Sequence, residues 1–247
     1  MRSRACCIPF YTSGECGILR QLRKCEDPTD EPLSRSQDKK TGGAEARGSG
    51  KRAQNKLQNR QSILTAAREV FAEVGYEAAS VRDIIGRTGL ASGTFYNYYR
   101  SKEEIARAIA SDAAMRLRPI LRAHREQATD FASYLIGIVR VYFEFIVDEQ
   151  MALPTTRPLA ERYPRVRVQT PATTAVFEEV RSSIELVMQR DPALRVDVEY
   201  LTAAVIGVAR EIGERMLARQ PLDIERAAAF AANLILRGLP AIPRIEF

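Results

Sequence analysis

From residue 57 onward the apolar residues recur every three or four positions, and this spacing constrains the fold of the chain more than any other feature. In the first such segment, residues 57–74, the members of the apolar face are Ile63, Leu64, Ala67, Val70 and Phe71. Spacing of this kind places side chains on one face of an amphipathic helix. Similar segments follow as far as residue 237, and none alternates convincingly as a half-buried strand does. The sequence therefore predicts an all-α fold.

Two short helices with a glycine between them are expected directly after that first helix. Ser80 lies three residues before Asp83, the spacing of a capping box that begins a helix. Gly89 then supplies a turn, and a second short helix is predicted for residues 91–99. Two short helices joined by such a turn form a helix-turn-helix, whose second helix enters the major groove of DNA.

The second short helix carries polar side chains of the kind that contact DNA. Small polar groups allow a helix axis to approach base edges, and Ser92, Gly93, Thr94 and Asn97 fit this need. Donors for phosphate are expected on its flanks, and these are Tyr96, Tyr99, Arg100 and Lys102. Each of them could instead be a packing or solvated surface residue.

Positive charge is concentrated in the same region. The chain carries a net charge of +6, and residues 51–102 alone carry nine Lys or Arg against four Asp or Glu. Residues 103–247 are nearly balanced, with nineteen against twenty. A basic module joined to a neutral one is typical of a nucleic-acid-binding protein. Before the first apolar face, a basic arm of Lys51, Arg52, Lys56 and Arg60 is expected to follow phosphate rather than to recognise bases.

Residues 60–105, NRQSILTAAREVFAEVGYEAASVRDIIGRTGLASGTFYNYYRSKEEI, resemble the DNA-binding domain of the TetR (tetracycline-repressor-like) family. The resemblance rests on the stretches ILTAAREVFAEVGY, SVRDIIGRTG and GTFYNYYRSKEEI. It implies a homodimer with a C-terminal ligand-binding domain, in which a small molecule usually relieves repression. It also assigns DNA contacts from the second short helix to Ser92, Thr94 and Asn97, backbone contacts to Tyr96 and Lys102, and contacts with phosphate, and sometimes with a base, to Ser80 and Arg82. Ala91 departs from the pattern, because a capping Ser is frequent at that position.

Three parts are expected along the chain. Residues 1–50 contain few large apolar residues after Cys25 and are predicted to be disordered, residues 51–105 form the DNA-binding domain, and residues 106–247 form the ligand-binding and dimerisation domain. Helices are expected at about 101–127, 129–152, 172–190, 195–219 and 222–237. Pro119 is expected to bend or break the first of these, and Thr129 to cap the second.

The C-terminal helices offer a dimer interface and a ligand pocket. Small residues in the last two helices, such as Gly207 and Ala231, allow close helix packing, and the resemblance places the dimer interface there; intramolecular packing is the alternative. The aromatic face of the helix at 129–152 carries Tyr134, Tyr142 and Phe145, which could line an apolar ligand pocket or simply form core. His124 is expected at the surface.

Several classes of protein are disfavoured. The chain has one His, no Cys after residue 25, no Gly-rich phosphate loop and no paired Glu-x-x-His motif, so an enzyme, a metal site and a cofactor are not expected. No apolar run reaches the roughly 20 residues that span a bilayer, and a cytoplasmic location is expected.

The sequence thus predicts a ligand-responsive transcriptional regulator, with a repressor favoured. It would bind palindromic operator DNA as a dimer and be released by a small apolar or amphipathic molecule. A non-repressor DNA-binding protein of the same fold, such as an activator or a nucleoid-associated factor, is the alternative, and a helical-bundle enzyme is a remote one.

Overall fold

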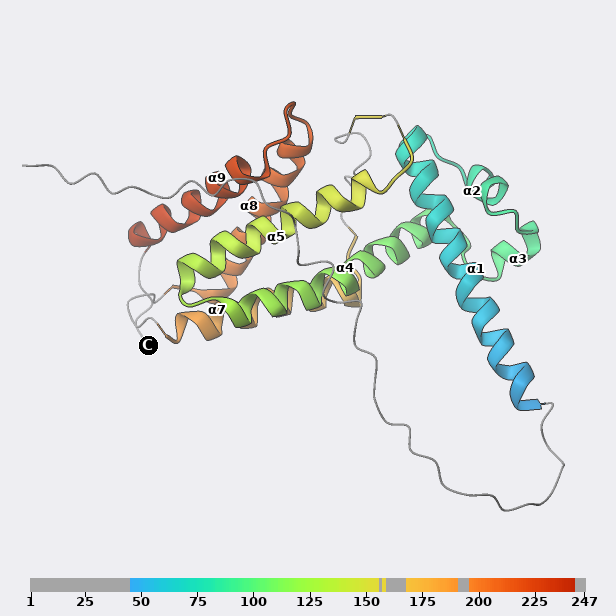
Figure 1. Ribbon diagram of the computed structural model, residues 1–247, viewed down its shortest axis with the longest axis horizontal. Helices are drawn as coiled ribbons and strands as arrows, with labels where there is room; N and C mark the ends of the chain where they lie inside the picture. The colour runs from blue at the N-terminus through green and yellow to red at the C-terminus, as the bar shows by residue number, and fades with distance from the viewer. Residues whose placement is uncertain (1–44, 156, 159–167, 191–195, 243–247) are drawn as a thin grey trace, which may run out of the picture. The chain divides into compact units, whose positions relative to one another are not determined.

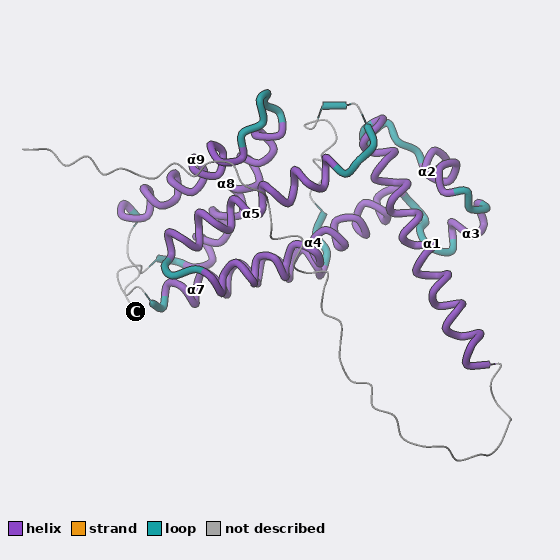
Figure 2. Tube along the Cα trace, in the orientation of Figure 1, coloured by secondary structure: helices purple, strands orange, loops and turns teal. Residues whose placement is uncertain are grey.

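The computed structural model of the protein describes residues 45–155, 157–158, 168–190 and 196–242, and all regular structure in these ranges is helical (Figures 1 and 2). In chain order the elements are α1 (Glu45–Val74), α2 (Val81–Thr88), α3 (Ser92–Tyr96), α4 (Lys102–Gln127), α5 (Phe131–Met151), α7 (Pro171–Met188), α8 (Val198–Leu217), α9 (Ile224–Gly238) and the 3-10 helix η2 (Leu239–Ala241). The predicted all-α fold is confirmed.

Two separate hydrophobic cores lie along the chain. The first joins α1, α2, α3 and the first turns of α4; we call residues 50–109 the head. Its buried members are Ile63, Leu64, Ala66, Ala67, Val70, Phe71, Ala79, Ile84, Phe95, Tyr99 and Ile105. The second core begins at Leu117 and joins the rest of α4 to the later helices; we call the described residues from 114 to 242 the bundle.

The expected domain boundaries stay predictions beside the described helices. Helix α1 already begins at Glu45, inside the segment 1–50 that was expected to be disordered. The described residues from 47 onward belong to one compact unit, in which α4 runs without interruption from the head core into the bundle core. The division between residues 105 and 106 therefore remains a prediction about function.

Helix α4 continues through Pro119, so the expected break does not occur. Proline has no N–H, which leaves the carbonyl of Met115 without its helical partner. Met115 and Pro119 both lie on the exposed side of α4, where water can bond to that carbonyl. The cap expected at Thr129 is also displaced by one residue, since the Asp130 carboxylate accepts the Ser133 N–H at 2.7 Å and begins α5.

The bundle packs α4 against α7, and α9 against both α5 and α8. Because α5 has neighbours on several sides, it buries more than the face that the sequence predicts, and Val139, Phe143 and Val147 are buried as well. Gly213 on α8 permits one of these contacts: a Cβ there would lie 2.9 Å from Ile146 Cδ1.

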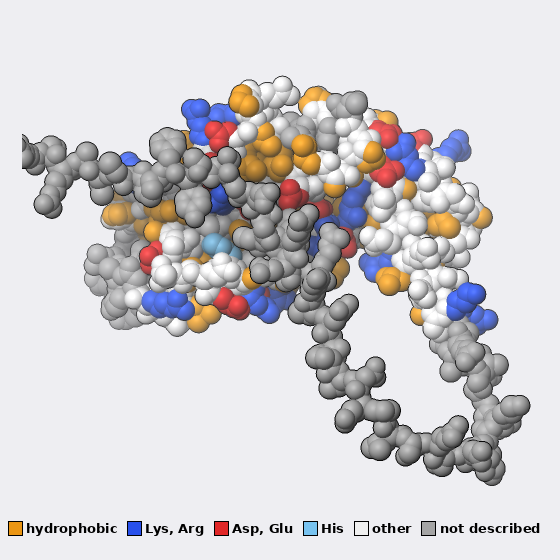
Figure 3. Space-filling model, in the orientation of Figure 1, with side chains coloured by type: hydrophobic (Ala, Val, Ile, Leu, Met, Phe, Trp, Pro, Cys, Tyr) orange, Lys and Arg blue, Asp and Glu red, His pale blue; other side chains and the backbone are white. Residues whose placement is uncertain are grey.

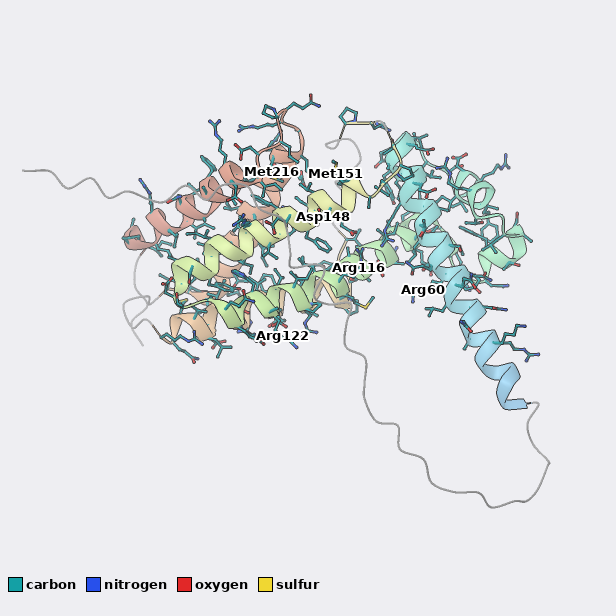
Figure 4. All side chains as sticks on the ribbon, in the orientation of Figure 1. Arg60, Arg116, Arg122, Asp148, Met151 and Met216 are labelled. Atoms are coloured by element: carbon teal, nitrogen blue, oxygen red, sulfur yellow. The ribbon has the colours of Figure 1, made fainter. Side chains whose placement is uncertain are left out.

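A buried carboxylate joins α4 to α7. Glu179 on α7 accepts hydrogen bonds from Arg118 at 3.0 Å, Arg122 at 2.6 Å and Arg125 at 3.1 Å, all from one side of α4 (Arg122 is labelled in Figure 4). These bonds, above all those from Arg122, hold the pKa of Glu179 below its ordinary value. Buried charge is tolerated when it is paired in this way.

His124 is half-buried, which corrects its expected surface position. Its ring occupies the space beside Gly137 on α5, where a Cβ would lie 1.7 Å from Nε2. Nε2 is buried without a hydrogen-bond partner among the described residues, and burial lowers the pKa of His124. Gly137 is therefore a packing requirement of the α4–α5 contact.

None of the helices in the described ranges combines the length and the hydropathy that crossing a membrane requires.

Candidate nucleic-acid interface

The connection between α2 and α3 is fixed by local hydrogen bonds. The Ser80 hydroxyl accepts the Asp83 N–H at 3.2 Å, and the Asp83 carboxylate accepts the Ser80 N–H at 2.9 Å, so the predicted capping box is present. These bonds from Ser80 lower the pKa of Asp83. At the other end of α2, Gly89 adopts a left-handed conformation with φ of 67°, which favours glycine. The two ends of α2 are thus set by the residues that the sequence indicated.

A threonine and a phenylalanine hold the turn in place. The Thr88 hydroxyl donates to the Ile85 carbonyl at 2.9 Å and accepts the Leu90 N–H at 3.2 Å. Phe95 on α3 is fully buried in the head core. Ala91 begins α3 without a side-chain cap, as its sequence departure suggested. Helix α3 is therefore positioned by its turn and its buried ring rather than by an N-cap.

The exposed face of α3 brings most of the predicted contacts together. Its members are Ser92, Gly93, Tyr96 and Asn97, which are exposed, and Thr94, which is partly exposed. Tyr96 is 52% exposed, a large fraction for an aromatic side chain. The first turn of α2 adds Arg82, which is also exposed. The Ser80 hydroxyl is engaged in the capping box and donates to the Asp83 carboxylate at 2.6 Å.

Tyr99 lies elsewhere than its predicted role requires. It is 6% exposed and belongs to the head core, and its hydroxyl accepts a hydrogen bond from Arg60 Nε at 3.1 Å (Arg60 is labelled in Figure 4). This bond raises the pKa of Arg60. The structure thus gives Tyr99 a packing role, which the sequence did not distinguish from that of the exposed Tyr96.

The Lys102 ammonium is occupied within the head. Nζ donates to the carbonyls of Tyr76 and Glu77, each at 3.0 Å, and of Ala79 at 3.3 Å. It also lies 4.8 Å from the centroid of the Tyr76 ring, a cation–π distance. An ammonium has three donors, so Lys102 fixes the α1–α2 connection with all of them.

A hollow of about 390 Å³ lies between α1 and α3; we call it the α1–α3 hollow. Its α1 side is lined by Arg52, Asn55, Lys56 and Asn59, and its other side by Thr94, Asn97 and Tyr98. The blue side chains near the free end of α1 in Figure 3 mark the basic arm. Sequence reasoning identified the two cations and missed Asn55 and Asn59, although their spacing of three and seven residues from Arg52 places all four on one helix face.

The three candidate ligand residues on α5 occupy different environments. Tyr134 is fully buried, and its hydroxyl has no hydrogen-bond partner among the described residues. Burial raises the pKa of Tyr134. The neighbouring Ser183 hydroxyl donates instead to the Glu179 carbonyl at 2.6 Å. Tyr142 and Phe145 are partly buried against the bundle core.

Helices α8 and α9 leave apolar side chains exposed. Tyr200 on α8 is 78% exposed, and Phe230 and Leu234 on α9 are 59% and 54% exposed. Ala203 and Ala204 of α8 are exposed as well. These residues lie on the two helices for which a dimer interface was predicted.

Within the described ranges, no three His, Cys, Asp or Glu residues gather as metal ligands. The four cysteines lie outside these ranges.

Comparison with known proteins finds a family sequence model and several solved structures that are similar to this chain. Residues 63–109 match the sequence model of bacterial regulatory proteins of the tetR family. A TetR-family transcriptional regulator from Syntrophomonas wolfei has a similar fold, with a TM-score of 0.60 and 20% identity over 78% of this chain and 100% of that one. PfmR, a TetR-family regulator from Thermus thermophilus, has a TM-score of 0.54 and 25% identity over 72% of this chain and 95% of that one.

A third similar structure contains a ligand. The transcriptional regulator FadR from Bacillus subtilis, in complex with stearoyl-CoA, has a TM-score of 0.57. It is 18% identical over 72% of this chain and 98% of that one. At this identity the likeness concerns the fold alone.

Proposed function

With the N-terminal domain of the tetR family and the fold of that family's transcriptional regulators, this chain is a TetR-family regulator, and we propose that it is a ligand-responsive repressor. It binds palindromic operator DNA as a homodimer and is released by a small apolar or amphipathic molecule. It acts in the cytoplasm, where the operator is found.

The observation that carries this proposal is the exposed face of α3. A short helix with a buried Phe95 and exposed Ser92, Gly93 and Asn97 can enter a major groove without steric obstruction from long side chains. Thr94 and Asn97 are the base contacts that we propose, because hydroxyl and amide groups can hydrogen-bond to base edges. Tyr96 and Arg82 are proposed to bind phosphate.

A dimer is required because one five-residue helix contacts only a few base pairs. Two heads about one or two helical turns of DNA apart would bind a palindrome. The exposed Tyr200, Phe230 and Leu234 supply an apolar face on α8 and α9 that a second copy would cover.

The proposed ligand site centres on Tyr134. A buried hydroxyl without a partner carries a free-energy cost that a ligand's polar group would relieve. Tyr142 and Phe145 on the same helix would pack against the apolar part of the ligand. FadR of Bacillus subtilis is similar in fold and binds stearoyl-CoA, an amphipathic molecule, and we propose a ligand of this general class.

Selection of bound duplexes from a random pool tests this function. We expect enrichment of a palindrome, and a particle of twice the chain mass by light scattering. Phe230→Glu is expected to give a monomer that no longer selects a palindrome, whereas Met115→Glu, at an exposed site on α4, leaves the dimer intact. A wild-type chain that remains monomeric and enriches no sequence would contradict the proposal. Long-chain acyl-CoA is the first ligand to test, by thermal shift and by release of DNA.

A further inference from the structure

Helix α1 extends well beyond the core that it serves. Its buried residues begin at Ile63, yet every residue from 50 to 58 is helical and exposed. A polar helical extension gains nothing from core packing, and short helices alone are marginal in water. The extension therefore needs a partner outside the head core.

One face of this extension, continued to Asn59, carries basic and amide side chains that can donate several hydrogen bonds each. Arg52, Asn55, Lys56 and Asn59 follow each other at spacings of three, one and three residues and line the same hollow. Arginine and lysine bind phosphate through charge-assisted hydrogen bonds, and amides add neutral ones.

The α1–α3 hollow is electrostatically unbalanced. No carboxylate lines it, and neither Arg52 nor Lys56 forms an ion pair within the described ranges. Other arginines of the head are paired with carboxylates, as Arg87 is with Glu73 at 2.5 Å and Arg68 with Asp112. Two unpaired cations in one hollow favour an anionic occupant.

The two sides of the hollow are held together by polar contacts at its base. Asn59 Nδ2 donates to the Tyr98 hydroxyl at 3.3 Å, and one residue later Arg60 binds the Tyr99 hydroxyl. Both tyrosines lie in the segment just after α3. The extension is therefore fixed beside the same helix that we propose to enter the major groove.

We propose that the α1–α3 hollow binds the phosphate backbone of the operator beside the base pairs that α3 contacts. Arg52 and Lys56 neutralise the phosphates, while Asn59 is a positioning residue that holds the extension against Tyr98. The inference rests on the proposed function, because Thr94 and Asn97 on the opposite side of the hollow are the proposed base contacts. It makes α1 a second DNA-binding element of each head.

The test measures the affinity of the full chain for its selected duplex over a range of salt concentrations. The variant is Arg52→Ala/Lys56→Ala, two exposed positions whose loss leaves the head core intact. Its matched control, Arg181→Ala/Arg219→Ala, removes the same charge from the bundle. A second variant, Arg52→Lys/Lys56→Arg, keeps the charge and exchanges the donors.

The plot of log K against log salt falls by about 0.9 per phosphate neutralised. We therefore expect Arg52→Ala/Lys56→Ala to flatten the slope by about 0.9 for each cation lost in each head, with the selected base sequence unchanged. The bundle control and the charge-preserving variant keep the wild-type slope.

Two results would overturn the inference while leaving the proposed function standing. One is wild-type slope and affinity in Arg52→Ala/Lys56→Ala. The other is a changed base preference without a change of slope, which would mean that the arm contacts a groove instead of phosphate. Failure of the wild-type chain to bind any duplex would instead overturn the proposed function.

Discussion

The head and the bundle differ in how they obtain their rigidity. In the head, the Ser80 capping box and the left-handed Gly89 set the two ends of α2 locally, and Lys102 binds three carbonyls that lie 23 to 26 residues before it. In the bundle, the polar contact that joins α4 to α7 spans a greater separation in sequence. Three arginines of α4 donate hydrogen bonds to Glu179, which lies more than fifty residues later in the chain. A DNA-binding surface needs a fixed geometry in every state, whereas a ligand-responsive core needs contacts that can exchange between helices.

The largest expected effect is the loss of unfolding free energy when a buried ring is removed from one of the two cores. Phe95→Ala in the head and Phe143→Ala in the bundle each remove a fully buried ring, and each is expected to cost about 3–5 kcal/mol of unfolding free energy. Phe95→Ala should abolish DNA binding while the chain stays dimeric. Phe143→Ala should loosen the bundle while the head keeps its slow amide exchange. The measurements are hydrogen exchange, light scattering and duplex binding.

Because α4 belongs to both cores, the two regions could also unfold as one. If both variants lose amide protection equally in the head and in the bundle, the two cores are not independently stable, which would contradict this prediction. Val74→Ala, at an exposed side chain of α1 in the head, is the control and should leave both stability and duplex binding nearly unchanged.

A smaller effect is expected from the charged contact in the bundle. Glu179→Gln keeps the shape of the side chain and weakens its bonds to Arg118, Arg122 and Arg125, at a cost of about 1.5–3 kcal/mol near neutral pH. The folded-state pKa of Glu179 lies below 4.5, so its stabilisation is present above pH 4.5 and is lost as the pH falls through the folded-state pKa.

Urea unfolding at a series of pH values checks this prediction. Wild type and Glu179→Gln should differ most near neutral pH and converge in acid. Glu185→Gln on the same helix removes an exposed ion pair with Arg181 and should change stability by no more than about 1 kcal/mol. A gap between wild type and Glu179→Gln that persists unchanged into acid would argue against the charged contact as its cause.

The smallest effect concerns Lys102. Lys102→Met removes its hydrogen bonds to the α1–α2 connection and is expected to cost about 1 kcal/mol of unfolding free energy. DNA affinity should fall by a similar factor on all sequences, because the whole helix-turn-helix loses its support. Lys56→Met is the control and should leave stability unchanged. Unaltered stability with weakened DNA binding would instead assign Lys102 to direct phosphate contact.

The same contrast explains what the sequence could predict. Rules that act over three or four residues foresaw the Ser80–Asp83 box and the turn at Gly89, and the structure confirms both of them. They could not separate Tyr96 from Tyr99, because both are tyrosines near α3 and only the tertiary contact with Arg60 distinguishes them.

In the bundle, local rules predicted helices and missed their partners. The place of His124 depends on the missing side chain of Gly137 on another helix, and the buried state of Glu179 depends on arginines more than fifty residues away. The continuity of α4 through Pro119 depends on exposure of the freed carbonyl. In each case the residues next to His124, Glu179 or Pro119 in the sequence do not reveal the tertiary contact or exposure on which its position depends.

Binding of Thr94→Ala and Asn97→Ala to the selected duplex and to a scrambled duplex of the same composition tests the central claim most directly. If the exposed face of α3 contacts bases, each variant loses about 1–3 kcal/mol on the selected duplex and almost nothing on the scrambled one. Equal losses on both duplexes, or no loss on either, would contradict it.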